Sequence, residues 1–375
     1  MPNLSDLSFE DIRPYHNEEV NEVLKGVVEK PSFFELIQYL FPNLTAEQVV
    51  ASFRKIHTTR EFQAQYIHQA IRTMISSSIS DLTFSGFENL DPQEPCLFIS
   101  NHRDIILDSA LLNVLLFEEG FETTQIAIGD NLMVSPLVTD LMKLNKSFVV
   151  FRNLSPQQLL AASDQLSHYI RHVITDRIDS VWIAQRGGRT KDGHDQTQPA
   201  LLKMLMRSGD SDVSASLKPL KIVPMTVSYE YEPCDYLKVE ELYHRDHDLP
   251  YQKDDKLAMV LGIREPKGRV HLEVGKPLGH ELDGLSGNRN EQIREVCQIL
   301  DQHIHRQYRL WPINWVAADL ISGKNEFQAH YTEEDRAKFV QYVSNRIAHI
   351  SGDSEALRER MYQLYAQPIF NSARR

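Results

Sequence analysis

The feature that most constrains the fold is a series of short, β-rich apolar runs that alternate with helical patterns. The runs are CLFIS (96–100), TQIAI (124–128), SFVVF (147–151), SVWIA (180–184), LKIVPMTVSY (220–229) and RVHLEV (269–274). Between two of them lies SPQQLLAASDQLSHYIRHVITDR (155–177), which has helical spacing. Strands that alternate with helices predict an α/β fold, in which helices cover a mostly parallel, mixed sheet.

Helical patterns flank this segment on both sides. Before it, TTREFQAQYIHQAIRTMISSS (58–78) repeats apolar residues at helical spacing, and Thr45 with Gln48 predicts a capping box. After it come the helical candidates NEQIREVCQILDQHIHRQY (290–308), TEEDRAKFVQYVSNRIAHI (332–350) and SEALRERMYQLYAQ (354–367). We therefore predict three units: an N-terminal helical domain (1–80), an α/β domain (81–283) and a C-terminal helical region packed on it (284–375).

Composition narrows the class of protein. A formal net charge of −12 over 375 residues argues against nucleic acid as a partner. The cysteines Cys96, Cys234 and Cys297 lie far apart without CxxC spacing, which argues against a disulfide framework or a structural zinc site. The N-terminal residues lack the pattern of a signal peptide, and no run reaches about 18 apolar residues. We expect a cytoplasmic protein whose membrane contact is peripheral.

Polar residues follow the predicted strands where ligands bind in such folds, at the carboxyl ends. These residues are Asn101-His102-Arg103-Asp104, Gly129-Asp130-Asn131, Arg152-Asn153, the run from Gln185 to Lys191, and Ser228-Tyr229-Glu230. A histidine and aspartates follow one strand, and four cations follow two others. This asymmetry favours a single site with a base and an anion-binding part.

His102 is the candidate general base, because imidazole can accept a proton from a hydroxyl group near neutral pH. It needs a carboxylate to orient it, and the sequence offers Asp104 or Asp108. If a helix begins near Ile105, Asp108 lies in its first turn and can point back at the loop. The alternative is that Asp104 caps this helix and His102 is an ordinary loop residue.

Arg152, Arg186, Arg189 and Lys191 predict an anion site, since guanidinium groups bind phosphate through paired hydrogen bonds. Gly187 and Gly188 let the backbone approach a ligand closely, and Arg103, beside His102, is a further candidate substrate ligand. The alternative is a solvated loop of ordinary salt bridges. The sequence contains no GxSxG, GxxxxGK[ST] or GxGxxG pattern, which argues against serine hydrolases, P-loop proteins and Rossmann-type cofactor binding.

Four blocks of the chain, in order, resemble those of the glycerolipid acyltransferases, the superfamily of glycerol-3-phosphate and lysophosphatidic acid acyltransferases. NHRDIILD (101–108) resembles the His-Asp box, SFVVFR (147–152) the second block, GGRTKDG (187–193) the third and KIVPMTVSYE (221–230) the fourth. IRPYHNEEV (12–20) and SVWIAQRGGRTKDG (180–193) also resemble a bacterial branch of this superfamily.

The resemblance implies roles for these residues. His102 would deprotonate the acceptor hydroxyl, Asp108 would orient it, and Arg152 and Arg189 would bind the acceptor phosphate. Two positions depart from the family pattern. Five residues separate His102 from Asp108 where the family has four, so a bulge, or Asp104 in the role of Asp108, would have to absorb the extra residue. Arg186 stands where the family has Glu, which makes the anion site more basic.

The function implied is acyl transfer from acyl carrier protein or acyl-coenzyme A to glycerol 3-phosphate or a lysophospholipid, without a metal or organic cofactor. The alternatives are an acyltransferase-like binding or scaffold protein with a degenerate site, and an esterase with an unrecognised nucleophile. Membrane contact is expected at the active-site mouth and the C-terminal helix. There an apolar stripe either contacts lipid or packs inward; it consists of Leu357, Met361, Leu364 and Tyr365, and Arg358, Arg360, Arg374 and Arg375 accompany it.

Overall fold

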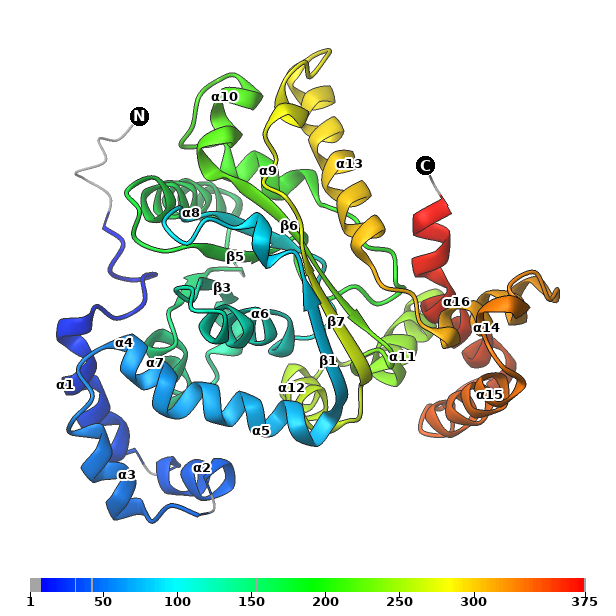
Figure 1. Cartoon of the computed structure of the whole chain (residues 1–375), viewed down its shortest axis with the longest axis horizontal. Helices are drawn as coiled ribbons and strands as arrows, with labels where there is room; N and C mark the ends of the chain where they lie inside the picture. Colours follow the sequence, from blue (N-terminus) through cyan, green and yellow to red (C-terminus); the bar gives the residue numbers. More distant parts are fainter. Residues whose placement is uncertain (1–7, 31, 42, 153, 374–375) are drawn as a thin grey trace.

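A seven-stranded mixed sheet forms the centre of the molecule (Figure 1). It is seen in a computed structural model that describes residues 8–30, 32–41, 43–152 and 154–373. The strand order is β1-β7-β6-β2-β5-β3-β4, and only the β6–β7 pair is antiparallel among the described pairs. The strands are β1 (Ile79–Ser85), β2 (Leu97–Ser100), β3 (Gln125–Gly129), β4 (Ser147–Val150), β5 (Val181–Ala184), β6 (Ile222–Tyr229) and β7 (Gly268–Val274). The predicted α/β class and all six predicted strands are confirmed.

Helices cover both faces of this sheet. On one face, α5 (His68–Ser78) and α6 (Leu107–Glu118) bury apolar side chains against it, among them Ile75 and Leu111. On the other face lie α8 (Pro156–Thr175), α9 (Pro199–Leu205), α10 (Val213–Leu217) and α13 (Arg289–Gln307). Because β2, β5 and β6 are covered on both sides, their residues are almost all buried, which explains their continuous apolar runs.

The N-terminal helices form a cluster of their own around Leu24, Phe33 and Phe53, and α7 (Pro136–Leu144) packs into it. They are α1 (Asn17–Val28), α2 (Phe33–Leu40), α3 (Ala46–Phe53) and α4 (Thr59–Phe62), which continues through a π-helical turn (Gln63–Ile67) into α5. The predicted capping box of Thr45 and Gln48 begins α3 and is confirmed.

The C-terminal helices lie at the opposite end of the molecule from α1–α3 (Figure 1). They are α14 (Pro312–Ser322), α15 (Glu333–Ile347) and α16 (Ser354–Ala373), which pack with α11 (Asp235–Asp246) in a third apolar cluster. α12 (Asp255–Arg264) lies against α5. The division of the chain at residues 80 and 283 stays a prediction.

The apolar stripe of α16 faces inward. Leu357, Met361, Leu364 and Tyr365 are each at most 3% exposed, so of the two alternatives for this stripe, packing within the protein is the one that the structure shows. Arg374 and Arg375 lie outside the described residues. None of the described helices is long and apolar enough to cross a bilayer.

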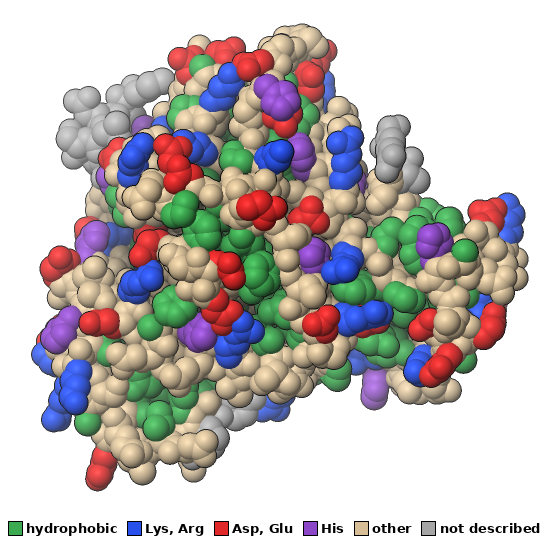
Figure 2. Space-filling model, viewed as in Figure 1, with side chains coloured by type: hydrophobic (Ala, Val, Ile, Leu, Met, Phe, Trp, Pro, Cys, Tyr) green, Lys and Arg blue, Asp and Glu red, His purple; other side chains and the backbone are tan. Residues whose placement is uncertain are grey.

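The surface carries charges of both signs. On the face shown in Figure 2, Asp and Glu side chains lie interspersed with Lys and Arg over the described residues. Such mixing does not create the extended single-sign field that steers a charged polymer onto a protein.

Candidate active site

In the loop between β2 and α6, backbone amides donate hydrogen bonds to the carboxylates of Asp104 and Asp108. Asp104 accepts hydrogen bonds from the backbone amides of Ile106 and Leu107, both at 2.8 Å, through one carboxylate oxygen. It therefore caps the first turn of α6, where unpaired amides and the helix dipole favour an anion. Asp108 lies in this first turn, so its side chain points back at the loop, as the sequence predicted.

Asp108 holds the imidazole of His102. Its Oδ2 lies 2.9 Å from Nδ1 of His102 and also accepts the backbone amides of Arg103 (2.7 Å) and Asp104 (3.0 Å). The backbone thus wraps around this carboxylate, and the wrap accommodates the five residues between His102 and Asp108. Because a carboxylate can only accept hydrogen bonds, Nδ1 of neutral His102 carries the proton, and Nε2 keeps its lone pair.

Tyr229, the last residue of β6, binds the other oxygen of Asp108. Its hydroxyl donates to Oδ1 at 2.9 Å, and the ring is 1% exposed. Burial, followed by the charge of Asp108, raises the pKa of Tyr229 well above its ordinary value, so the hydroxyl stays protonated and continues to donate. The sequence analysis named Tyr229 among the polar residues at a strand end but assigned it no role.

His102 lines a cavity of about 520 Å³ whose walls are mainly apolar. Its walls include Ile128 at the end of β3, Val150 at the end of β4, and Leu159 and Leu166 of α8. Trp182 of β5 also lines it and packs edge-on against the imidazole, with ring centroids 6.0 Å apart. The side chain of His102 is 12% exposed and that of Asp108 is fully buried, so the histidine alone faces a ligand.

Arginines without acidic partners lie beside the histidine. Arg152, after β4, and Arg186, after β5, line the same cavity as His102. Within the described parts of the chain, neither has a carboxylate within ion-pair distance, and Nε of Arg186 is buried without a hydrogen-bond partner. An unpaired buried guanidinium nitrogen is costly, so the arrangement favours an anionic ligand there.

The β5 loop (residues 185–198) places the remaining predicted ligands. Gly187 lines the cavity, whereas Gly188, Arg189 and Lys191 are not among its lining residues. Lys191 pairs with Glu241 of α11, so it is already neutralised. Arg189 has a buried guanidinium nitrogen without a partner. The structure thus brings Arg186, rather than Arg189, together with Arg152.

Arg103 requires a correction. We predicted it as a substrate ligand, but it is 1% exposed and its guanidinium pairs with Asp195 at 2.5 Å and Glu232 at 2.9 Å. A cation that is buried between two carboxylates is not available to a ligand in the cavity. The polar box after β2 therefore contains one residue that faces the cavity, His102, and three buried ones that support the structure around it.

Comparison with known proteins supports this picture for the central part of the chain. Residues 81–228 match the family model described as Acyltransferase. A search of curated proteins finds no match. Among solved structures, the 1-acyl-sn-glycerophosphate (LPA) acyltransferase PlsC from Thermotoga maritima is similar at 12% identity. The similarity extends over 76% of this chain and 97% of that chain, with a TM-score of 0.38.

The matched segment begins within β1 and ends at Ser228, next to Tyr229. It includes the His102 box, both cavity arginines and the β5 loop. Residues 81–228 of the chain thus match an acyltransferase domain.

Proposed function

We propose that this acyltransferase moves a fatty acyl group from acyl carrier protein or acyl-coenzyme A to a hydroxyl group of glycerol 3-phosphate or a lysophospholipid. One observation carries the proposal: an Asp108-held histidine lines an apolar cavity together with two arginines that lack acidic partners. Each part matches one part of the reaction. The apolar walls suit an acyl chain, the histidine suits the acceptor hydroxyl, and the arginines suit a phosphate.

In the proposed mechanism, Nε2 of His102 removes the proton of the acceptor hydroxyl as its oxygen attacks the thioester carbonyl carbon. The tetrahedral intermediate then collapses, the carbon–sulfur bond breaks, and the imidazolium returns its proton to the leaving thiolate. Asp108 stabilises the imidazolium between these steps and fixes the tautomer, with Tyr229 holding its second oxygen. No enzyme nucleophile is required.

The size and lining of the cavity support an acyl-chain site. A volume of about 520 Å³ falls within the range of roughly 300–1,000 Å³ that is usual for small-molecule pockets. The cavity lies between the ends of β3 and β4 and the helices α8 and α9, all of which contribute apolar side chains. An acyl chain in this cavity would bring its thioester carbonyl to His102 at the wall.

The mouth of the cavity supports peripheral membrane contact. Leu159 and Leu160 of α8 are 47% and 54% exposed, and Leu159 also lines the cavity. Val134 is 43% exposed and shares a shallow surface hollow with Leu132, which lines the cavity as well. Exposed apolar side chains beside a lipid-type cavity favour contact with a bilayer surface. We call Val134, Leu159 and Leu160 the mouth rim.

The proposal is tested by an acyl-transfer assay of the purified protein. Thioesters of both donors, at several chain lengths, are combined with glycerol 3-phosphate, lysophosphatidate and the unphosphorylated counterparts glycerol and monoacylglycerol, and products are identified by mass spectrometry. We expect transfer to the phosphorylated acceptors and none by a folded His102→Ala variant. Absence of transfer in every combination, by a protein that still binds an acyl donor, would favour the binding or scaffold function.

A further inference from the structure

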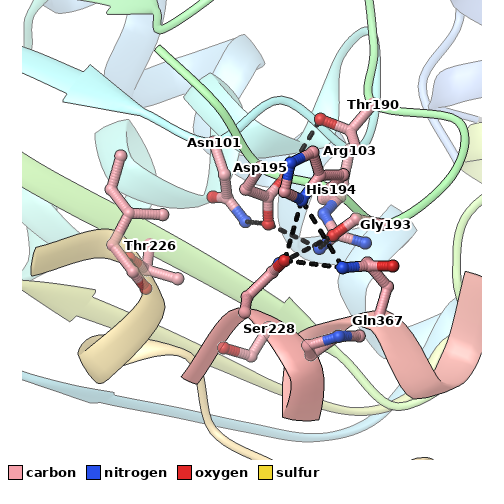
Figure 3. A network of polar contacts seen from close by, with 12 residues as sticks. Asn101, Arg103, Thr190, Gly193, His194, Asp195, Thr226, Ser228 and Gln367 are labelled. Atoms are coloured by element: carbon pink, nitrogen blue, oxygen red, sulfur yellow. Dashed lines mark hydrogen bonds and ion pairs between the residues drawn. The ribbon is translucent and has the colours of Figure 1, made fainter. Parts of the chain in front are cut away.

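A buried polar network joins the end of β2 to the β5 loop (Figure 3). Asp195 lies at its centre. One oxygen of Asp195 is 2.5 Å from the guanidinium of Arg103 and 3.5 Å from the amide of Asn101, and the other accepts the Thr190 hydroxyl at 2.9 Å. Arg103 and Asp195 are each 1% exposed, so both charges depend on one another rather than on water.

The charges of this network balance. Arg103 binds Glu232 as well as Asp195, and Glu232 also binds Lys238 at 2.5 Å. Two cations thus face two carboxylates, all buried. Replacing either Asp195 or Arg103 by a neutral residue would leave an uncompensated buried charge, which is strongly destabilising. Any conformation that separates these two side chains has the same cost, so the cluster favours a single arrangement. The ion pair between Arg103 and Asp195 therefore holds the β5 loop to the end of β2.

Two helices outside the segment matched by the family model hold the same loop from its other side. Asn371 of α16 donates to the carbonyl of Gly193 at 3.0 Å, and its oxygen contacts the His194 ring at 3.0 Å. His305 of α13 donates to the carbonyl of Asp195 at 2.6 Å. The loop between Thr190 and Asp195 is thus held between β2 on one side and α13 and α16 on the other.

The loop is also connected directly to the candidate base. The backbone amide of Thr190 donates to the carbonyl of His102 at 2.7 Å. Arg189 immediately precedes Thr190, and Arg186 lies three residues earlier. The position of Thr190 therefore restrains where the cavity arginine Arg186 lies relative to His102, and the Asp195 carboxylate restrains the position of Thr190 by accepting a hydrogen bond from its hydroxyl.

We propose that Asp195 is a positioning residue, which holds the cavity arginine Arg186 at a fixed distance from His102 through Arg103 and Thr190. An anionic acceptor bound by Arg186 together with Arg152 is then held with its hydroxyl group at the base. The inference rests on the proposed function in that it assumes an anionic acceptor. Its first consequence, that the conformation of the loop depends on Asp195, is independent of activity.

The test uses the whole 375-residue chain and two substitutions, each of which weakens the contact between Thr190 and Asp195. Asp195→Asn keeps the shape but removes the charge, and Thr190→Val keeps the volume but removes the hydroxyl donor. Thr190→Ser retains the hydroxyl and should restore wild-type behaviour. The matched control is Asp176→Asn, the same change at an exposed carboxylate that binds His172. Hydrogen exchange of the loop amides and steady-state kinetics are measured for each variant.

We expect faster amide exchange across residues 186–195 in Asp195→Asn and Thr190→Val, but not in Thr190→Ser or the control. The KM for glycerol 3-phosphate or lysophosphatidate should rise by about tenfold, with kcat and the donor KM changed less than about threefold. A role in overall stability alone would not produce this separation of KM from kcat. Should Asp195→Asn fail to fold, Thr190→Val against Thr190→Ser decides the question.

Unchanged exchange and unchanged acceptor KM in both variants would overturn the inference, as would a fall in kcat without a change in acceptor KM. If the wild-type protein acylates no phosphorylated acceptor, the proposed function fails instead. Exchange of the loop amides, measured with and without inorganic phosphate, then still reports whether Asp195 positions an anion-binding loop. Phosphate should protect the wild-type loop and protect the Asp195→Asn loop less.

Discussion

Asp108 accepts hydrogen bonds from two backbone amides, an imidazole and a phenol, and this number of donors distinguishes it from Asp104. We predict that Asp108→Asn lowers kcat by roughly 10³-fold or more, because an amide can present its NH₂ group to Nδ1 and favour the wrong tautomer. Asp104→Asn should keep most activity and cost about 1 kcal/mol of stability as a weakened cap. Kinetics and denaturant unfolding of both variants check this. A larger loss of kcat in Asp104→Asn would contradict the assignment.

Tyr229 is predicted to act on His102 only through Asp108. Tyr229→Phe removes one hydrogen bond to a charged group, which is worth about 1.5–3 kcal/mol, so kcat should fall by roughly 10- to 100-fold. KM for both substrates should hardly change, since the hydroxyl lies behind Asp108. The control is Tyr308→Phe, another buried tyrosine that stacks on Arg103 at 5.2 Å. Equal loss in both variants would indicate a general packing effect.

At the residue scale, the side chains that line the cavity could be predicted from the sequence better than the buried side chains that hold them in place. His102, Arg152 and Arg186 could be found because each follows a strand and carries a charge or a titratable ring. Asp108 could be found because it falls in the first turn of the helix that comes next. Arg103 was misassigned on the same reasoning, because its partner Asp195 is 92 residues away and burial is not visible in a local pattern. Long-range pairing decided which polar residues support the structure.

At the scale of elements, the loops after β4 and β5 supply the cavity cations. We predict that Arg152→Ala and Arg186→Ala each raise the acceptor KM by roughly 10- to 100-fold, corresponding to about 1–3 kcal/mol of lost charge-assisted hydrogen bonding. kcat should change less. The control is Arg177→Ala, an exposed arginine that pairs with Glu94 at 3.3 Å. An acceptor KM that stays at the wild-type value in both cavity variants would refute the anion site.

The turn at Gly193 is predicted to connect α16 to the β5 loop. Gly193 has φ of +76°, and a Cβ there would lie 2.6 Å from the carbonyl oxygen of Leu364 in α16. Gly284 has the same φ but open space around it, so Gly284→Ala reports backbone strain alone. We expect Gly193→Ala to lower Tm more than Gly284→Ala and to raise the acceptor KM as well. Equal effects would show that α16 does not restrain the loop.

Elements with continuous apolar runs were predicted well, and elements without such runs were missed. β2 to β7 lie deep in the sheet or carry clear β-rich runs, so all were found. β1 (ISDLTFS) is an edge strand with one buried residue, and its polar positions conceal the strand pattern. α14 was also missed, and two of its six buried residues, Asn314 and Asp319, are polar and interrupt its apolar pattern.

At the scale of the whole molecule, burial rather than amphipathicity decides which surface can meet a bilayer. The α16 stripe had the composition of a membrane contact, but a helix stripe looks the same whether it covers lipid or another helix. Its side chains fill the cluster shared by α11, α14 and α15. The exposed leucines of the mouth rim remain, beside the cavity that would receive an acyl chain.

We therefore predict that Leu159→Ser combined with Leu160→Ser weakens binding to anionic liposomes. Without the two exposed leucines, the protein buries less apolar area at the membrane and loses roughly 2–4 kcal/mol of binding free energy. The floated fraction should therefore fall by tenfold or more. Ile178→Ser is the matched control, since Ile178 is 50% exposed but precedes β5 and so lies at the opposite edge of the sheet. Because soluble acyl donors do not require the rim, turnover of glycerol 3-phosphate in the absence of lipid should be retained. Flotation of the double variant at the wild-type level would exclude the mouth rim as the membrane contact, and a wild-type protein that does not float at low salt would exclude the contact altogether.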